Sequence, residues 1–296
     1  MIEANGLFIG VDIGKTKISS GIINIKKLTI LDSLYEEYSV KTKECILSIV
    51  ENHICHYIKS FHVEGIGIAS FGLIDKKNEF VISSKSISEW NNVHLAKYCR
   101  EKFGIENTFV FNDVTAACVG EYFKLGNVNS LCYISVGTSI GVSAIIKGKI
   151  LEGEHNLSGQ IAHIEIANGQ TFSDLCGGNG IERQYSLLTG NFRRVKEIFE
   201  QSKNNDVIAK LVRDKAVENL VLLANMTCLM IDPEVLVFGG GVMQDKEFRN
   251  DTIELLEQRI IDSLKVKQSP YSVWSSCGIY DVAILGGAIL CHLHVK

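Results

Sequence analysis

The 296-residue chain has only two prolines and no low-complexity segment. Composition therefore marks no flexible linker, and a boundary between domains is expected to be a compact crossing. No apolar run reaches membrane-spanning length, and the first residues enter an apolar strand without the basic, apolar and small-residue order of a signal peptide. These absences predict a globular cytoplasmic protein with no membrane partner.

The chain also lacks an excess of positive charge. Its formal net charge is −4 and its isoelectric point is near 6.1, so it offers no broad basic surface for nucleic acid. Its nine cysteines include no C-x-x-C pair, and we expect reduced thiols, mostly in the core. Hydrophobic residues make up 46% of the chain, enough for one large or two medium domains.

Two short stretches of the sequence look like variants of one another. Residues 7–23 and 131–146 each read as an apolar strand, a glycine- and threonine-containing turn, and a second β-branched strand. The turn residues are Gly14 and Thr16 in the first stretch and Gly137 and Thr138 in the second. Glycine lets backbone amides approach an anion, and threonine adds a hydroxyl donor. A single Gly-Thr turn is common between strands without any function. The duplication instead favours two turns that hold one polyphosphate.

Residues 10–16 also resemble a Walker A loop. That motif has four residues between its glycines, whereas three separate Gly10 from Gly14, and a strand rather than a helix is expected next. We therefore reject a P-loop.

Hydrophobic periodicity predicts an α/β protein built from two related halves. A β-meander is expected over residues 6–40. The expected helices cover 42–60, 92–103, 114–123, 180–188, 205–231 and 246–264, the expected strands cover 65–70, 108–111 and 235–238, and a last strand and helix begin near Val282 and Gly286. We expect an N-terminal lobe of residues 1–112, joined by a C-terminal helix at about 284–296, and a C-terminal lobe of residues 113–283.

Asp113 is the candidate catalytic residue. It follows the apolar strand 108–111 at the start of an expected helix, and ligands of α/β sheets bind at the carboxyl ends of strands. A carboxylate there can accept the proton of a substrate hydroxyl. The alternative is that Asp113 only caps the helix. Its place between two phosphate-type turns favours the catalytic interpretation.

In this order and spacing, the motifs resemble those of the ROK family of sugar kinases, within the actin, Hsp70 and hexokinase superfamily. The matching segments are 8–17, 112–121, 137–141, 232–242 and 285–288. The resemblance implies a two-lobed actin-like, ribonuclease H-like ATPase fold with duplicated βββαβα-type domains and a central cleft. It also implies transfer of the ATP γ-phosphoryl group to a sugar hydroxyl, usually the 6-hydroxyl, by a protein whose relatives commonly form homodimers.

The resemblance also implies roles for individual residues. Asp113 would be the general base, Asn112 would hold a neighbouring hydroxyl, and Asp12 would be the partner of hydrated Mg²⁺. The residues implied to bind ATP are Gly14, Thr16, Lys17, Gly137, Thr138, Gly239, Gly240 and Gly241. Asp12 has an alternative interpretation as a turn-stabilising carboxylate, and Lys17 as a solvated lysine at a strand edge.

The sugar-binding region departs from the family pattern. The usual Gly-Glu-x-Gly-His segment appears here with Gln160 in place of the glutamate and with His163 retained. A charged acceptor is thereby replaced by a neutral group that both donates and accepts hydrogen bonds. Asp174, or its neighbour Ser173, stands where the family keeps a sugar-binding glutamate. A helix cap is an equally good interpretation of Asp174.

Further changes affect the upstream contacts and the zinc site. Gly72 keeps a family glycine, whereas Ser86 stands where a sugar-contacting asparagine is usual. We interpret the family's cysteine-rich zinc knuckle as deleted, because residues 175–185 align better with the turn and helix that follow it. His163 and Cys176 alone do not complete a four-ligand zinc site, so we predict no structural zinc.

These changes leave the substrate open among glucose, an amino sugar, N-acetylmannosamine and a β-glucoside. A sugar sensor that has lost catalysis is the alternative; the intact Asp113 argues against it and Gln160 keeps it open. Repressors of the family carry a winged helix–turn–helix before the first phosphate motif, and no basic recognition helix is expected here. The Asn112-Asp113 pair favours a sugar kinase over the ATPases of the superfamily.

Overall fold

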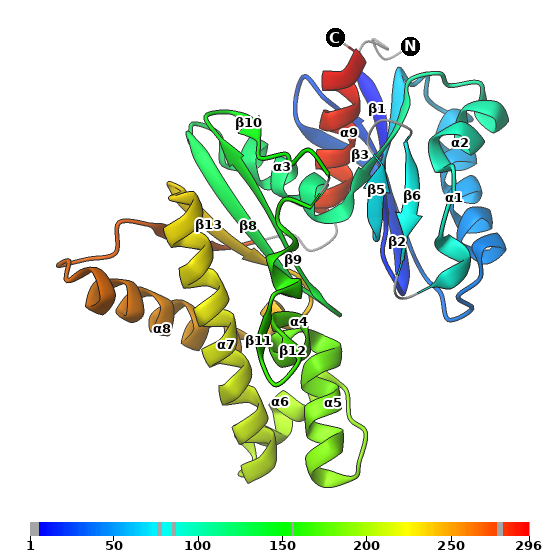
Figure 1. The fold of residues 1–296 in the computed structure, drawn as a ribbon. Helices are drawn as coiled ribbons and strands as arrows, with labels where there is room; N and C mark the ends of the chain where they lie inside the picture. Colours follow the sequence, from blue (N-terminus) through cyan, green and yellow to red (C-terminus); the bar gives the residue numbers. More distant parts are fainter. Residues whose placement is uncertain (1–5, 76–78, 85–86, 156, 277–280, 296) are drawn as a thin grey trace. The chain divides into compact units, whose positions relative to one another are not determined.

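The computed structural model describes residues 6–75, 79–84, 87–155, 157–276 and 281–295. The chain divides into two compact units. Unit 1 comprises residues 1–127, 153–156 and 280–296, and unit 2 comprises residues 128–152 and 157–279. Each unit is built on its own five-stranded sheet (Figure 1).

In unit 1 the strands lie in the order β3-β2-β1-β4-β7. Their bounds are β1 (Leu7–Ile13), β2 (Lys17–Asn24), β3 (Thr29–Glu37), β4 (Gly65–Ser70) and β7 (Thr108–Asn112), and β5 (Leu73–Asp75) pairs separately with β6 (Phe80–Ser83). The helices are α1 (Lys43–Ile58), the 3₁₀ turn η1 (Ser88–Trp90), α2 (Leu95–Phe103), α3 (Asp113–Leu125) and α9 (Asp281–Val295). β1 runs antiparallel to β2 and parallel to β4, which is parallel to β7.

The two faces of this sheet have different partners. Leu7, Ile9 and Val11, which alternate along β1, share a hydrophobic core with apolar residues of α1 and α2. On the opposite face α9 lies directly against the sheet backbone: a Cβ on Gly10 would stand 2.0 Å from the Ile284 oxygen. Figure 1 shows α9 beside β1 on the side away from α1. Glycine in the strand permits this close contact between helix and sheet.

Helix α9 also packs tightly against α3. A Cβ on Gly286 would lie 1.7 Å from the Ala116 oxygen, so the two helix backbones touch. Consequently α3 belongs to unit 1, which continues to residue 127 rather than stopping at the expected residue 112.

The expected strand near Val282 is wrong, because Val282 lies inside α9. The apolar, partly β-branched residues 282–285 resemble a buried strand in composition. A short apolar run does not distinguish a buried strand from a buried helix, and here the tertiary contacts of α9 select the helix.

In unit 2 the strands lie in the order β10-β9-β8-β13-β14. Their bounds are β8 (Ser130–Val136), β9 (Ile140–Ile146), β10 (Lys149–Ile150), β13 (Val235–Gly239) and β14 (Ser272–Ser275), and β11 (Glu165–Ala167) pairs with β12 (Gln170–Thr171). The helices are η2 (Gln160–His163), α4 (Phe172–Cys176), α5 (Gly178–Thr189), α6 (Val195–Lys203), α7 (Val207–Ile231), η3 (Val242–Gln244) and α8 (Lys246–Leu264). One hydrophobic core joins α4 to α8 with β8, β9 and β13.

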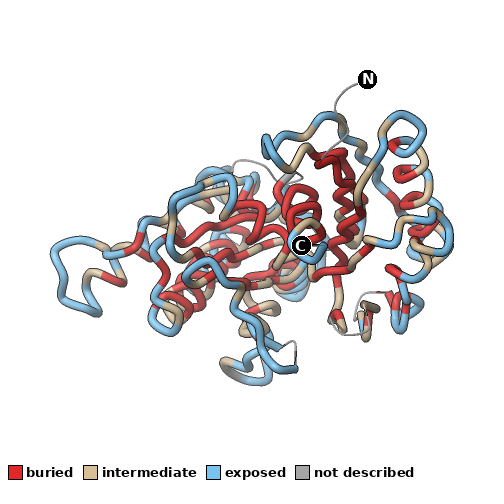
Figure 2. The backbone as a smooth tube through the Cα atoms, turned by 90° about the horizontal axis from the view of Figure 1, so that it is seen from above, coloured by how far each residue is buried: buried red, intermediate tan, exposed pale blue. Residues whose placement is uncertain are grey.

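The two sheets repeat one plan, which confirms the prediction of two related α/β halves. In each, an antiparallel hairpin leads into a third antiparallel strand at the edge, and the first strand pairs in parallel with a later one. Figure 2 shows the buried residues concentrated in the sheets and their helices and the exposed residues in connecting loops. Among the described residues, no helix is both long and apolar enough to cross a bilayer.

Candidate active site

In unit 1, several predicted site residues gather where parallel strands end. β1, β4 and β7 lie side by side, with Asp12 opposite Ala69 and Ser70 opposite Asn112. Asp113 follows as the first residue of α3. Gly72 comes two residues after β4, has a φ of +104°, and accepts a hydrogen bond from Asn112 Nδ2 at 3.3 Å. Ser86, the remaining predicted sugar contact from this part of the chain, lies outside the described residues.

Asn112, not Asp113, is the N-cap of α3. Its Oδ1 accepts hydrogen bonds from Val114 N at 3.0 Å and Thr115 N at 3.2 Å. Asp113 accepts one from Val114 N at 2.9 Å, and no side chain of the described residues donates to its carboxyl group. The cap is therefore supplied by the neighbour, and the Asp113 carboxyl retains capacity for a further hydrogen bond.

The two aspartates of this site are harder to ionise than ordinary aspartates. Burial, reinforced by the charge of Asp113 and opposed by that of Lys17, raises the pKa of Asp12 to about 7. Burial also raises the pKa of Asp113 to about 6, while the Val114 hydrogen bond and the Lys15 charge act in the opposite direction. Both residues are of intermediate exposure. A carboxyl group with a pKa near neutrality is suited to accept a proton.

The first turn connects β1 to β2 and holds Gly14, Thr16 and Lys17. Gly14 N donates to Lys17 O at 2.9 Å and closes the turn. The strand β2 follows the turn, whereas a Walker A loop would lead into a helix. Within the described part of the chain, the N–H groups of Lys15 and Thr16 donate to no protein acceptor. Two successive amides are thus available to an anion.

Lys15 was not among the residues singled out from the sequence. Its pKa is lowered mainly by burial, and Asp113 acts on it in the opposite direction. This interaction places its charge within electrostatic reach of the candidate base. The lysine within the turn was visible in the sequence, but the pairing with Asp113 depends on contacts between distant segments. Lys17 instead acts on Asp12, with its Nζ 6.0 Å from the centre of the Tyr35 ring.

The second turn, between β8 and β9, is held by the start of α5. Gly178 N donates to Gly137 O at 2.8 Å, and Asn179 N donates to Thr138 O at 3.0 Å. In a trans peptide the N–H points opposite to the C=O, so the N–H groups of Thr138 and Ser139 point away from α5. Neither of these two amides has an acceptor among the residues described. Ser139 therefore joins the predicted Gly137 and Thr138 as a candidate phosphate contact.

The three glycines at the end of β13 have different surroundings. Gly239 and Gly240 pack against β8: a Cβ would lie 2.1 Å from Tyr133 Oη in the first case and 2.5 Å from Val136 O in the second. Gly240 also has a φ of +92°. A Cβ on Gly241 would meet nothing within 4 Å. Gly241 therefore has open space beside its backbone, whereas Gly239 and Gly240 fit closely against β8.

The other predicted sugar contacts lie in unit 2. Gln160 is half-buried and His163 is exposed at the two ends of η2. Asp174 forms a capping box at the start of α4: its Oδ2 accepts from Thr171 N at 3.0 Å and Thr171 Oγ1 at 2.7 Å, and its Oδ1 accepts from Arg183 at 3.0 Å. Because both oxygens have partners, the structure agrees with the capping interpretation. A sugar contact by Asp174 stays a prediction.

Ser173 has a more direct link to the second turn. Its Oγ lies 2.8 Å from Ser139 Oγ and accepts from Ile140 N at 3.3 Å. Cys176 is buried in the core, where its Sγ donates to Phe172 O. The absence of a structural zinc stays a prediction.

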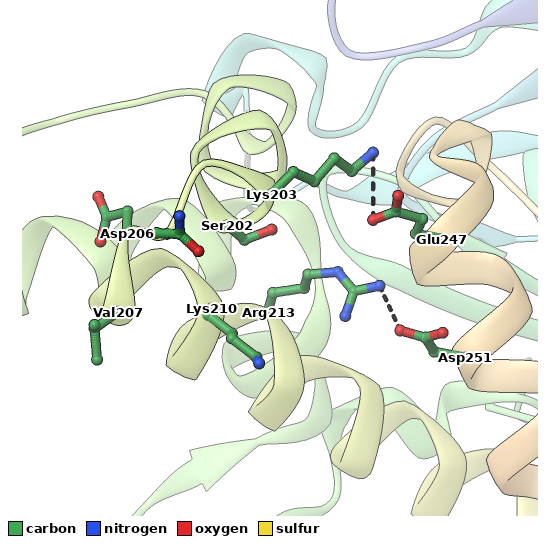
Figure 3. Close-up of a pocket in the computed structure, with 9 residues that line it drawn as sticks. Ser202, Lys203, Asp206, Val207, Lys210, Arg213, Glu247 and Asp251 are labelled. Atoms are coloured by element: carbon green, nitrogen blue, oxygen red, sulfur yellow. Dashed lines mark hydrogen bonds and ion pairs between the residues drawn. The ribbon is translucent and has the colours of Figure 1, made fainter.

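A separate cavity of about 410 Å³ lies in unit 2 between α6, α7 and α8 (Figure 3). None of the predicted site residues lines it. Lys203 pairs with Glu247 at 3.7 Å, and Arg213 pairs with Asp251 at 2.5 Å. Because these charges compensate one another, the cavity has no marked preference for an anion or a cation.

Comparisons with known proteins agree with the fold and the motifs. The chain is 24% identical to the glucokinase of Thermotoga maritima over 95% of each chain, and 23% identical to the N-acetylmannosamine kinase of Vibrio cholerae over 95% of this chain and 97% of that one. The crystal structure of a ROK family glucokinase from Streptomyces griseus, in complex with glucose and AMPPNP, superposes with a TM-score of 0.82 at 22% identity, covering 97% of this chain and 100% of the other. The two-lobed actin-like fold expected from the sequence is thereby confirmed. Since a model of the ROK family matches residues 8–292, the chain belongs to the ROK family.

Proposed function

We propose that the protein is an ATP-dependent sugar kinase that phosphorylates the 6-hydroxyl of a hexose or hexose derivative. Family membership and the kinases among its relatives support a phosphotransferase that acts on a sugar hydroxyl. The observation that carries the proposal is the division of labour at the start of α3: Asn112 caps the helix, and Asp113 presents a carboxyl with a pKa of about 6.

In this proposal Asp113 accepts the proton of the sugar hydroxyl. The hydroxyl oxygen then forms a bond to the γ-phosphorus, and the bond from that phosphorus to the bridging oxygen of ADP breaks. Phosphoryl transfer requires mainly positioning and neutralisation of charge. In this proposal the amides of Lys15, Thr16, Thr138 and Ser139, which have no acceptor among the described residues, donate to the phosphate oxygens.

Asp12 fits the role of a partner for magnesium. No side chain of the described residues donates a hydrogen bond to it, and the neighbouring Asp113 disfavours its ionised form. Mg²⁺ prefers carboxylate oxygens and usually keeps waters and substrate phosphates as its other ligands. When bound, the ion would neutralise phosphate charge. The sugar contacts in this proposal are Gly72, Ser86, Asn112, Gln160, His163 and Asp174, and the adenosine contacts are Gly239, Gly240 and Gly241.

The proposal is tested by ADP release in the presence of ATP, Mg²⁺ and a panel of sugars. The panel contains glucose, glucosamine, N-acetylmannosamine and a β-glucoside. We expect turnover with at least one of them, and we expect D113N to lower kcat by roughly 10²-fold or more while it keeps the melting temperature and nucleotide affinity. The control is D32N: Asp32 lies on β3 and pairs with His56 at 2.9 Å, outside the predicted site.

Undiminished turnover in D113N would contradict the assignment of the base. Sugar binding without ADP release from any member of the panel would instead favour the sugar sensor. A homodimer stays a prediction, which sedimentation of the purified protein can check.

A further inference from the structure

Tyr38, the residue that follows β3, makes two hydrogen bonds to the first turn. Its Oη donates to Gly14 O at 2.6 Å, and its backbone N donates to Thr16 O at 3.0 Å. Its side chain is only 8% exposed and belongs to the hydrophobic core of unit 1. A single buried residue thus holds two carbonyl groups of this turn.

These bonds determine which groups of the turn are available to a ligand. Because the Gly14 carbonyl points to the Tyr38 hydroxyl, the Lys15 N–H of the same trans peptide points away from Tyr38. Without the hydroxyl, this peptide is free to rotate and to present its carbonyl oxygen in place of the N–H. A carbonyl oxygen repels phosphate, whereas an N–H binds it.

The second turn is held in the same way by different atoms. There the start of α5 supplies both donors, Gly178 N and Asn179 N, to the Gly137 and Thr138 carbonyls. No helix start holds the first turn in the part of the chain that the structure describes, and Tyr38 takes that role. In both turns, hydrogen bonds from the protein bind the carbonyl groups on one side. The amides on the other side therefore remain available to a ligand.

We propose that Tyr38 is a positioning residue for the nucleotide phosphates, because its hydroxyl orients the Gly14–Lys15 peptide so that the amide faces the ligand. This inference rests on the proposed function, in which the turn binds ATP. Burial raises the pKa of the Tyr38 hydroxyl, so the group remains a protonated donor over the working pH range. The ring fills the core, and the hydroxyl orients the turn.

The chain offers a matched control in Tyr57 of α1. Tyr57 is also a buried tyrosine of unit 1, and its Oη donates to a backbone carbonyl, that of Ser20, at 3.0 Å. Ser20 lies within β2, outside the turn. The variants Y38F and Y57F therefore each remove one buried hydroxyl, while only Y38F alters the turn.

The experiment measures MgADP binding by calorimetry without sugar, together with KM for ATP, KM for sugar and the melting temperature. We expect Y38F to weaken MgADP binding and to raise KM for ATP by roughly tenfold, the usual effect of one well-placed hydrogen bond. We expect KM for sugar to stay within twofold of wild type. Y57F should lower the melting temperature about as much as Y38F and leave nucleotide affinity unchanged.

Equal nucleotide affinities in Y38F and Y57F would overturn the inference and leave the proposed kinase intact. An equal rise in both Michaelis constants of Y38F would also overturn it, because a general loss of structure would explain the result. If the wild-type protein binds no MgADP, the proposed function fails and the inference fails with it.

Discussion

At the scale of single residues, Asn112 and Asp113 show how neighbours of similar chemistry take different tasks. Either side chain is suited to cap a helix, and the sequence leaves the choice open. In the structure the Asn112 amide bridges the helix start and the Gly72 carbonyl. An amide carries a donor and an acceptor, so it can make both contacts, whereas an ionised carboxylate can only accept. The Asp113 carboxyl is therefore not needed as the cap and can accept a hydrogen bond from a substrate.

The raised pKa values of Asp12 and Asp113 predict an acid limb in the pH profile of the reaction. Both folded-state values, about 7 and about 6, lie above the ordinary 3.8, and both proposed roles need the ionised form. We therefore expect kcat/KM to fall as the pH decreases from 7 to 5. Because the Lys15 charge lowers the pKa of Asp113, K15M should move this limb to higher pH.

The measurement is kcat/KM at limiting substrate between pH 5 and 8.5. K97M is the control, since Lys97 lies on α2 and pairs with Glu101 at 3.8 Å. An acid limb at the same pH in K15M and wild type would show that Lys15 does not act on the base.

At the scale of elements, the contact between α1 and β2 contains a buried histidine. His53 Nδ1 lies 2.8 Å from Ser20 Oγ, and its Nε2 lies 3.8 Å from Glu36. Burial lowers the pKa of His53 from 6.5, with Glu36 opposing and His56 adding to the effect. The charged form is therefore disfavoured where α1 packs on the sheet.

This histidine makes a destabilising contribution in mild acid, opposed by Asp12 and Asp113, whose raised pKa values favour the folded state as the pH falls. The unfolded chain takes up a proton near pH 6.5, and the folded protein resists it until a lower pH. The contribution of His53 to the free energy of unfolding should thus be fully present above pH 6.5 and be lost below it, by at most about 1.4 kcal/mol per pH unit for one proton. Urea unfolding of wild type and H53Q at pH 7.5 and 5.5 isolates this contribution, because Asp12 and Asp113 act in both proteins.

Between pH 7.5 and 5.5, wild type should lose more stability than H53Q, or gain less, because glutamine does not titrate. H62Q, at an exposed position after α1, is the control. If H53Q and wild type lose the same stability between the two pH values, His53 is not the group responsible.

Element types could be predicted from the sequence wherever a pattern is long. The expected helices at 205–231 and 246–264 correspond to α7 and α8 within two residues, because their apolar positions recur over many turns. The short strands β5, β6 and β14 were not anticipated. A run of three or four residues shows too few alternations to be distinguished from a loop.

At the scale of the whole molecule, the chain leaves unit 1 at residue 127 and, apart from residues 153–156, returns to it only at residue 280. The returning helix α9 contributes buried side chains, among them Ile284, Leu285 and Ile289, to unit 1. Its backbone also lies against Gly67 of β4, where a Cβ would stand 1.9 Å from the Gly287 oxygen. Unit 1 is therefore completed by the last segment of the chain.

Deletion of residues 281–296 should consequently loosen unit 1. Loss of α9 exposes apolar surface on β1 and β4, so we expect hydrogen exchange in these strands to accelerate by at least tenfold while β8 and β13 stay protected. A shorter deletion of residues 293–296, whose described side chains are exposed, is the control. Native-like protection of β1 and β4 without α9 would contradict this account.

The duplicated turns, the candidate base and the α/β class could all be recognised from the amino-acid order, because each depends on residues that are close together in the chain. Other features depend on distant segments: Gly72 completes the contacts of Asn112, Tyr38 holds Gly14, Lys15 acts on Asp113, and α9 closes the sheet of the first unit. Hydrogen bonds and charges act over a few ångströms of space whatever the separation along the chain. Folding alone brings these groups within that range.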